Sequence, residues 1–275
     1  MKKILLFSVA MSMLTFYSCS TVPLSGRNRI SFIDEAEMQT AAAQSYTALL
    51  KDPSTKVLNN AEAARVKRIG QKIATAVTQY MNANGFGEQI QGFKWEFNLI
   101  DSKEINAWCM PGGKVAIYTG ILPVTKDDAG LATVMGHEIA HAVAKHSSER
   151  ASKAALAEGV GGLLGAATSN KSEGTRQVLG SLYGIGAQAG YLLPNSRTQE
   201  LEADHLGLIF MSMAGYNPSN AIGFWQRMAS ASANSQKPPE FLSTHPADAT
   251  RIAQIQKDLP EAMKYLNSTS GKPVR

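Results

Sequence analysis

The sequence predicts an α+β fold, mainly helical, with a small sheet beside one central helix. Apolar side chains recur at helical spacing along several long segments of the 275 residues. The strand candidates, in contrast, are three short segments gathered between residues 93 and 119. The apolar fraction of 44% is ordinary for a globular protein, so the chain can bury a sizeable core.

The amino-terminal segment 1–18 has the features of a secretory signal. Two lysines precede an apolar run that is too short to span a bilayer comfortably. Cys19 stands where a bacterial lipoprotein signal places its acylated cysteine, although Phe16 and Tyr17 depart from the usual residues of that pattern. Ordinary cleavage after Ser20 is the alternative.

The cysteine count limits the possible disulfides, and the net charge limits the possible binding partners. If Cys19 carries lipid, Cys109 has no disulfide partner, and we expect a small buried hydrophobic side chain there. A Cys19–Cys109 disulfide requires that Cys19 is retained without lipid. The net charge of +5 comes from scattered lysines and arginines with no basic run of five, which argues against a nucleic-acid partner.

Two helices and three strands are expected before the central helix. Residues 19–33 are polar and rich in turn formers, so we expect a tether there. Asp34 or Ser31 can cap the first helix. Pro111-Gly112-Gly113 predicts a tight turn between the last two strands, because glycine admits positive φ. The expected elements are helices over residues 34–50 and 61–81 and strands over 93–100, 105–111 and 114–119.

The central helix is expected to have Thr125 as its cap and to run past His146. Its residues are apolar or small nearly all round, so it should be buried on most sides. Residues 154–194 are rich in Gly and Ala, and we expect two weak helices flanking a mobile loop that acts as a lid or plug over the cleft. Further helices are expected over residues 197–213, over 219–233, and from Pro246 to about 259.

Two histidines of the central helix, His137 and His141, are candidate metal ligands. Residues four apart face the same side of a helix, so both rings can reach one Zn²⁺ at about 2.0–2.1 Å. Glu138 lies beside them, where it can take a proton from an attacking water without binding the metal. Burying His-Glu-His in an apolar helix without a function would be costly, which argues against a plain core role.

A catalytic zinc needs a third protein ligand, and a later helix offers one. Glu200 is the candidate ligand, and Asp204, on the same face, would accept a hydrogen bond from a ligating histidine. The spacing alone also fits an exposed acidic helix turn. Glu202 is expected to face solvent, and His146 is expected to be a solvated or helix-capping residue.

Four features together resemble a known family. The features are His-Glu-Ile-Ala-His at 137–141, Glu-Leu-Glu-Ala-Asp at 200–204, Asn106-Ala107-Trp108 with Pro111-Gly112-Gly113, and Thr244-His245-Pro246 with Arg251. This pattern is similar to the membrane-associated zinc metallopeptidases of the HtpX and CAAX-prenyl-protease family, peptidase family forty-eight. It is most similar to the periplasmic lipoprotein branch, the BepA-like and LoiP-like proteases.

The resemblance implies a zincin-like fold, one Zn²⁺ per chain, protein or peptide substrates, and Glu200 as third ligand. It also implies an edge strand that binds substrate backbone by strand addition. Cys109 departs from the small or apolar residue usual in that strand, so a reactive thiol near the cleft is a second interpretation. We expect residues 34–275 to be a stand-alone metallopeptidase domain. The expected substrate-binding residues are Asn106, Trp108, Pro111, Gly112 and Gly113.

His245 precedes Pro246, which suits the first position of a helix, so we expect His245 at a helix N-terminus. The helix dipole there disfavours imidazolium. A neutral imidazole can close the zinc site as a fourth ligand, the latch role reported in BepA-like proteins, or donate a hydrogen bond to the tetrahedral oxyanion. A plain helix cap is the third possibility. Arg251 is expected to hydrogen-bond a substrate carbonyl or to hold the loop.

These observations predict a zinc-dependent metalloendopeptidase that cleaves misfolded or envelope proteins, with His245 as a latch. The alternative is a zinc-containing chaperone or assembly factor at the outer membrane with little proteolytic activity. Glu138 argues against that alternative, because a structural zinc site needs no base. We expect the protein in the periplasm, anchored to outer-membrane lipid through Cys19 and in contact with the outer-membrane assembly machinery.

Overall fold

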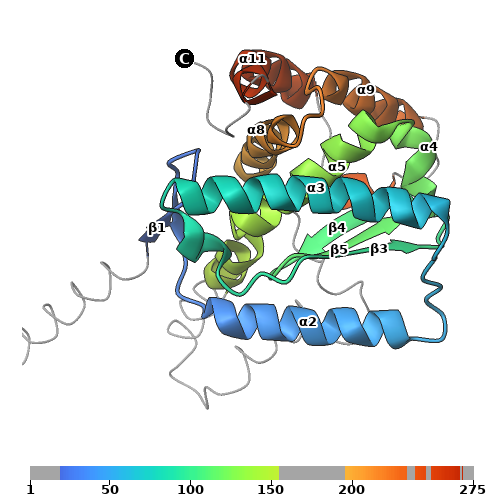
Figure 1. The fold of residues 1–275 in the computed structure, drawn as a ribbon, viewed down its shortest axis with the longest axis horizontal. Coiled ribbons are helices and arrows are strands. Elements are labelled where there is room, and N and C mark those ends of the chain that lie inside the picture. The colour runs from blue at the N-terminus through green and yellow to red at the C-terminus, as the bar shows by residue number, and fades with distance from the viewer. Residues whose placement is uncertain (1–18, 155–195, 234–238, 246–248, 267, 269–275) are drawn as a thin grey trace, which may run out of the picture.

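A small sheet lies between helical layers, as Figure 1 shows for the computed structural model. Helix α2 (Glu35–Lys51) covers one face of the sheet, and helices α3 (Ala61–Ala83) and α5 (Asp128–Val143) cover the other. This arrangement confirms the predicted α+β, mainly helical fold with a sheet beside the central helix. The structure describes residues 19–154, 196–233, 239–245, 249–266 and 268.

The sheet has three strands in the order β3-β5-β4, with β3 (Glu96–Ile100) parallel and β4 (Ala107–Met110) antiparallel to β5 (Lys114–Tyr118). The predicted Pro-Gly-Gly turn joins β4 to β5. Gly112 and Gly113 have φ values of 80° and 82°, which only glycine adopts without strain. The order places β4 at an edge of the sheet, as the family resemblance implied.

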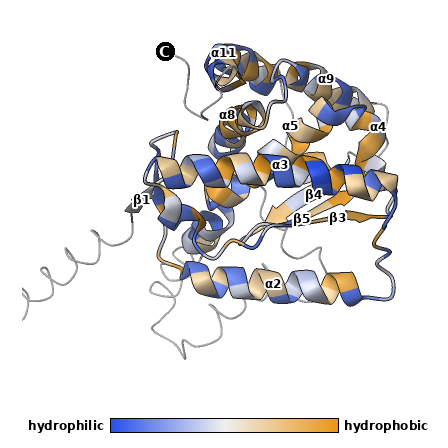
Figure 2. Ribbon diagram, viewed as in Figure 1, coloured by the Kyte–Doolittle hydropathy of each residue, from blue (hydrophilic) through white to orange (hydrophobic). Residues whose placement is uncertain are grey.

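Alternation along the strands divides the core between the two faces of the sheet. Val115 and Ile117 join the main cluster under α3 and α5, whereas Ala116 joins a second cluster with Tyr46 of α2. The Tyr46 hydroxyl donates to the Val115 carbonyl oxygen at 2.7 Å. Helix α3 is banded with hydrophilic and hydrophobic residues (Figure 2), as expected of an amphipathic helix that packs on one side.

The first two helices begin at the side-chain caps that their sequences offer. Asp34 accepts a hydrogen bond from the Glu37 backbone N–H at 2.9 Å, so the predicted Asp34 cap is confirmed. Asn60 caps α3 in the same way through the Ala63 N–H at 2.9 Å. Each cap satisfies a backbone donor that has no partner within its helix.

The central helix α5 begins later and ends earlier than predicted. Its cap is Asp127, which accepts from the Gly130 N–H at 2.8 Å, and not Thr125. Thr125 ends a separate short helix, α4 (Leu122–Thr125), because Lys126 takes a positive φ of 69°. A second positive φ, 55° at Lys145, ends α5 before His146, and residues 146–154 form a further helical stretch.

Helix α8 (Arg197–Met213) crosses α5 at a close approach of two glycines, Gly136 and Gly207. A Cβ on Gly207 would lie 2.8 Å from the His137 backbone nitrogen, so only glycine fits at this crossing. A capping box of Ser196 and Gln199 starts α8. Among the described residues, the helices that follow are α9 (Asn220–Ala233), α10 (Glu240–Thr244) and α11 (Ala249–Leu266), and 3-10 turns lie at Gly87–Ile90 and Thr119–Ile121.

The segment 19–33, expected to be a tether, is packed against the folded domain over much of its length. Strands β1 (Cys19–Thr21) and β2 (Asn28–Ile30) pair antiparallel. Val22 in the connecting loop is fully buried in the main core, and Arg29 is 3% exposed. The polar composition that suggested a tether therefore reflects buried hydrogen bonds made by this amino-terminal hairpin, residues 19–30.

Two expectations fall outside the described residues. The predicted secretory signal covers residues 1–18, which are not described, and of the predicted lid, residues 154–194, only Ala154 is described. In the described part of the chain, no helix combines the length and the apolar character needed to cross a membrane.

Candidate metal centre

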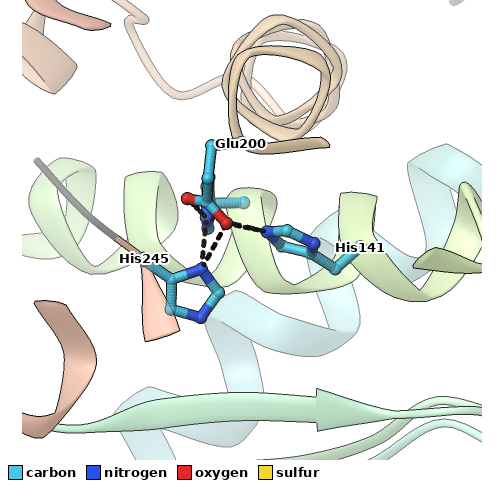
Figure 3. Close-up of side chains that lie close together, drawn as sticks. His141, Glu200 and His245 are labelled. Atoms are coloured by element: carbon cyan, nitrogen blue, oxygen red, sulfur yellow. Dashed lines mark hydrogen bonds and ion pairs between the residues drawn. The ribbon is translucent and has the colours of Figure 1, made fainter. Parts of the chain in front are cut away.

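Four buried side chains converge where α5 and α8 meet the end of α10. His137 and His141 come from α5, Glu200 comes from the first turn of α8, and His245 follows α10. One ligand atom from each lies within 4.8 Å of all the others. Figure 3 shows His141, Glu200 and His245 pointing toward one another. The structure thus brings together the histidine pair and the glutamate that the sequence placed 59 residues further on, together with His245.

The distances between these atoms fit a tetrahedral zinc site. The Nε2 atoms of His137 and His141 are 3.0 Å apart, and His137 Nε2 lies 3.2 Å from His245 Nδ1. Glu200 Oε1 lies 3.0 Å from His245 Nδ1 and 3.4 Å from His141 Nε2. Ligands about 2.0–2.1 Å from one tetrahedral ion are about 3.4 Å apart, so modest adjustment suffices.

Asp204 fixes which nitrogen of His137 faces the cluster. Its Oδ1 lies 3.0 Å from His137 Nδ1, and a carboxylate can only accept, so Nδ1 carries the proton. Nε2 is then the nitrogen that faces the other ligand atoms. Burial opposes protonation of His137, but Asp204 and Glu200 raise the pKa of this ring to about 9. The two carboxylates therefore favour a positive charge at this position, and a bound Zn²⁺ would supply that charge.

Arg251 holds two of the three carboxylates of α8, Glu200 and Asp204. Its guanidinium donates to Asp204 at 2.7 Å from both Nε and Nη2, and its Nη1 lies 2.9 Å from Glu200 Oε2. Nη1 also donates to the His245 carbonyl oxygen at 3.3 Å. The side chain is 2% exposed and stacks over the Trp225 ring, 3.8 Å from its centroid. Of the two expected roles, these contacts match holding the loop.

His146 is not the solvated or capping residue that we expected, because it is fully buried beside His141. Their Nδ1 atoms are 2.7 Å apart, and His146 Nε2 lies 2.9 Å from Glu202 Oε2. Burial lowers the pKa of His146 to about 4, so its ring is neutral at pH 7. The positive φ of Lys145 turns the chain and brings His146 back toward the metal centre.

Glu202 is likewise not a solvent residue, since it is only 7% exposed. It accepts hydrogen bonds from Arg27 at 2.9 and 2.7 Å and from Ser25 and His146. Burial opposes ionisation, but His146, Arg27 and Ser25 lower the pKa of Glu202 to about 2. Helical periodicity placed Glu202 correctly on the side away from Asp204. That side is nevertheless covered, because the amino-terminal hairpin packs there.

Glu138 lies beside the four ligand atoms and is 2% exposed. Among the described residues, none forms a hydrogen bond with its Oε1, and His245 Nε2 lies 3.4 Å from that atom. Burial raises the pKa of Glu138 above its ordinary value, against the opposing effect of His245, His137 and the backbone of Cys109. A buried carboxylate with a raised pKa and a free oxygen is suited to accept a proton.

His245 lies at the end of helix α10. It is the C-cap of α10, and its backbone N–H donates to the Phe241 carbonyl oxygen at 2.9 Å. The helix N-terminus expected at His245 and Pro246 falls outside the described residues, because residues 246–248 are not described and α11 is described from Ala249. Its ring reaches the cluster because Phe241 packs against it, with ring centroids 4.6 Å apart.

The residues predicted to bind substrate do not bring their side chains to the cluster. Trp108 is 2% exposed and packs edge-on against Tyr46, on the α2 side of the sheet. Asn106 is buried and accepts from its neighbour's backbone N–H. Pro111, Gly112 and Gly113 form the turn, where the two glycines pack against Gln39 and Trp95.

Cys109 faces the opposite side of β4 from Trp108 and packs against the main core. Burial, and then the charge of Glu138, raise the pKa of its thiol well above the ordinary value. The thiol is therefore protonated and weakly nucleophilic, which matches the interpretation as a small buried side chain. This placement also shows that the backbone of β4 runs beside Glu138.

The chain is similar to known peptidases. Residues 60–259 match the profile of peptidase family M48. The chain is 32% identical over 249 residues to the mitochondrial metalloendopeptidase OMA1 of Saccharomyces cerevisiae, and 32% identical over 241 residues to that of Schizosaccharomyces pombe. It is 28% identical over 190 residues to the beta-barrel assembly-enhancing protease of Escherichia coli.

These matches differ in their extent. The two yeast alignments cover 87% and 88% of this chain and 69% and 66% of the relatives, whereas the Escherichia coli alignment covers 66% of this chain and 38% of the relative. The more extensive of these matches are therefore to mitochondrial proteins, although the motifs resembled the periplasmic lipoprotein branch.

Proposed function

Because this chain belongs to peptidase family M48 and is a zinc metalloendopeptidase of zincin-like fold, we propose that His137, His141 and Glu200 hold its single zinc ion. The convergence of their ligand atoms within 4.8 Å, in a buried site, is the observation that carries the proposal. Asp204 and Arg251 fix His137 and Glu200 from behind, as residues around a metal site do.

Glu138 is the base in this proposal. When bound, zinc supplies a Lewis acid that acidifies water and polarises a carbonyl group. Glu138 takes the proton of the attacking water at its free Oε1 and returns it to the leaving amine nitrogen. Burial supports both steps, because it raises the pKa of the carboxyl group and so brings that pKa closer to the neutral pH at which the enzyme would work.

His245 acts as a latch. Its Nδ1 lies among the other ligand atoms, and its Nε2 faces Glu138. A catalytic zinc site keeps one position open, whereas four protein ligands close it. In the closed arrangement His245 would occupy the fourth ligand position as well as the space in front of Glu138. Hydrolysis then requires that His245 moves aside.

Protein substrates are held at the edge of the sheet. Strand β4 is an edge strand, and the Cys109 backbone runs beside Glu138, so a peptide added to this edge would lie next to the base. In this proposal Asn106, Trp108, Pro111, Gly112 and Gly113 shape the edge through their backbone and its turn. The substrates are misfolded or envelope proteins, for which the name of the Escherichia coli relative is the supporting analogy.

The place of action in this proposal is the periplasm, with the protein anchored by lipid on Cys19 to the outer membrane near its assembly machinery. The sequence of residues 1–19 supports this placement. Expression in a Gram-negative host with radiolabelled palmitate tests it. Label in the outer-membrane fraction that disappears in Cys19→Ala supports the anchor, and absence of label from the unmutated protein contradicts it.

Zinc content measured together with casein cleavage tests the catalytic proposal. Glu138→Gln is expected to keep about one zinc per chain and to lose at least about a hundredfold in cleavage, because general-base catalysis typically contributes that much. Glu88→Gln, at an exposed glutamate, is the matched control. One zinc per chain without cleavage by either the unmutated protein or its unlatched His245→Ala variant would instead favour a zinc-containing chaperone.

A further inference from the structure

The amino-terminal hairpin is bonded to the buried side chains that surround His141. Arg27 donates to both oxygens of Glu149, at 3.0 and 2.8 Å, and through Nε and Nη2 to Glu202. The Ser25 hydroxyl donates to the other oxygen of Glu202. The side chains of Glu149 and Glu202 are 2% and 4% exposed, so nearly all their hydrogen bonds are made within the protein.

The hydrogen bonds from Glu202 to the metal centre have a fixed direction. Ionised Glu202 only accepts, so His146 Nε2 must carry a proton and donate. A neutral imidazole has one donor nitrogen, so His146 Nδ1 is an acceptor. Its partner, His141 Nδ1, must then donate. That leaves the lone pair of His141 on Nε2, the atom that faces His137 and Glu200.

A second arginine of the hairpin fixes the backbone between these two histidines. Arg29 donates from Nη1 to the carbonyl oxygen of Ala144, the C-cap residue of α5. Its other nitrogens donate to Ser20 and Gln89 at 2.7 and 2.8 Å. Cationic side chains stabilise the unpaired carbonyl groups at a helix C-terminus. The hairpin thus holds both the backbone turn that carries His146 and the carboxylate to which His146 donates.

We infer that the amino-terminal hairpin is a positioning element of the metal site: Arg27 and Ser25 hold Glu202, Glu202 orients His146, and His146 fixes the ring of His141 for metal binding. This inference rests on the proposed zinc ligands and adds four residues that act through His141. Asp204 orients the other ligating histidine, so each histidine of the pair is oriented by a carboxylate of α8, directly for His137 and through His146 for His141.

Zinc affinity is the readout that separates orientation from simple packing. Zinc dissociation constants of the whole chain would be measured by competition with a chromophoric chelator. The variant Glu202→Gln preserves the size of the side chain but no longer forces the proton onto His146 Nε2. Its matched control is Glu261→Gln, at a half-exposed glutamate that also pairs with a histidine, His205. Ring-nitrogen NMR of the zinc-loaded protein would report the tautomers of His141 and His146.

Glu202→Gln is expected to raise the zinc dissociation constant about 10- to 100-fold, the usual effect of removing a partner of a ligating histidine. It should also change the ring-nitrogen signals of both histidines, whereas Glu261→Gln should change neither. A dissociation constant within about threefold of the unmutated protein, with unchanged ring signals, would overturn the inference. Absence of zinc binding by the unmutated protein would overturn the proposed ligands as well, so the two failures are distinguishable.

Arg27 tests the same inference from the side of the hairpin. Arg27→Lys keeps the charge but loses the fork that bonds both carboxylates, so we expect about a tenfold weaker zinc affinity. Arg27→Gln should weaken it further, with Arg68→Gln, at an exposed ion pair, as control. If Arg27→Gln fails to fold, Arg27→Lys and Glu202→Gln decide the outcome. Unchanged zinc affinity in both of them would contradict a role for the hairpin.

Discussion

His245 Nε2 lies 3.4 Å from Glu138 Oε1, so the side chain that closes the metal centre also stands in front of the proposed base. Removing the imidazole should therefore open both the fourth ligand position and the space for water. We expect His245→Ala to cleave casein at least about tenfold faster, equivalent to about 1.4 kcal/mol of activation free energy, and to retain zinc. Initial rates and zinc content measure both effects.

His205→Ala is the matched control for the latch, because His205 lies on α8 and pairs with Asp258 and Glu261 away from the cluster. It should leave the cleavage rate unchanged. Slower cleavage by a His245→Ala variant that still holds zinc would mean that His245 takes part in hydrolysis, as in the oxyanion alternative, and is not a latch.

Among the charged residues around the site, Arg251 is expected to contribute most to the stability of the fold. It pairs with both Asp204 and Glu200, and all three side chains are 2% exposed. Arg251→Gln would leave two buried carboxylates without their cation, at a cost of about 3–5 kcal/mol in the free energy of unfolding. Urea denaturation measures this loss. Arg68→Gln, which removes an exposed ion pair, should cost no more than about 1 kcal/mol.

The crossing of α5 and α8 explains why the site tolerates no side chain at Gly207. A methyl group there would lie 2.8 Å from the His137 backbone nitrogen, closer than van der Waals contact allows, and would also press on the Gly136 backbone. We expect Gly207→Ala to lower the free energy of unfolding by about 1–3 kcal/mol and to weaken zinc binding. Gly223→Ala in α9 is the control, since its added Cβ would meet only the end of the Arg227 side chain. Equal stability of the two variants would contradict this account.

Glu149 should make the stability of the fold depend on acid. Burial opposes its ionisation, but Arg27, Lys153 and Gln199 lower the pKa of Glu149 from 4.5 to about 2. A depressed pKa in the folded state means that stabilisation is complete above pH 4.5 and is lost as the pH falls toward 2. We expect the unmutated protein to be roughly 1–3 kcal/mol more stable than Glu149→Gln at pH 7.

Urea denaturation at pH 7, 5, 4 and 3 would follow that difference, which should shrink steadily below about pH 5. A difference that stays constant from pH 7 to 3 would show that Glu149 is not held ionised by Arg27.

The sequence was sufficient to predict which residues share one face of a helix, because helical spacing is a local property. His137 and His141 share a face of α5, and Glu200 and Asp204 share a face of α8. The structure places all four at one site. The edge position of β4 followed from the family resemblance and not from spacing.

The surroundings of the site depended on contacts between distant segments, which spacing does not report. Glu202 was assigned to solvent because helical spacing identifies only the main apolar face. Its partner Arg27 lies 175 residues earlier in a segment that resembles a tether by composition. His146 was misassigned because the positive φ at Lys145 ends α5, so its angular position on a continuous helix was meaningless. Helix α10, which ends at His245, was not expected, because a helix of five residues gives no periodic signal.

The most direct test of the central claim is the zinc content of Glu200→Ala, compared with the unmutated protein and with Glu88→Ala at an exposed position. Each protein would be dialysed against the same buffered zinc and analysed by mass spectrometry of the metal. We predict about one zinc per chain in the unmutated protein and the control, and well below one in Glu200→Ala. About one zinc in Glu200→Ala would contradict a metal site built jointly by α5 and α8.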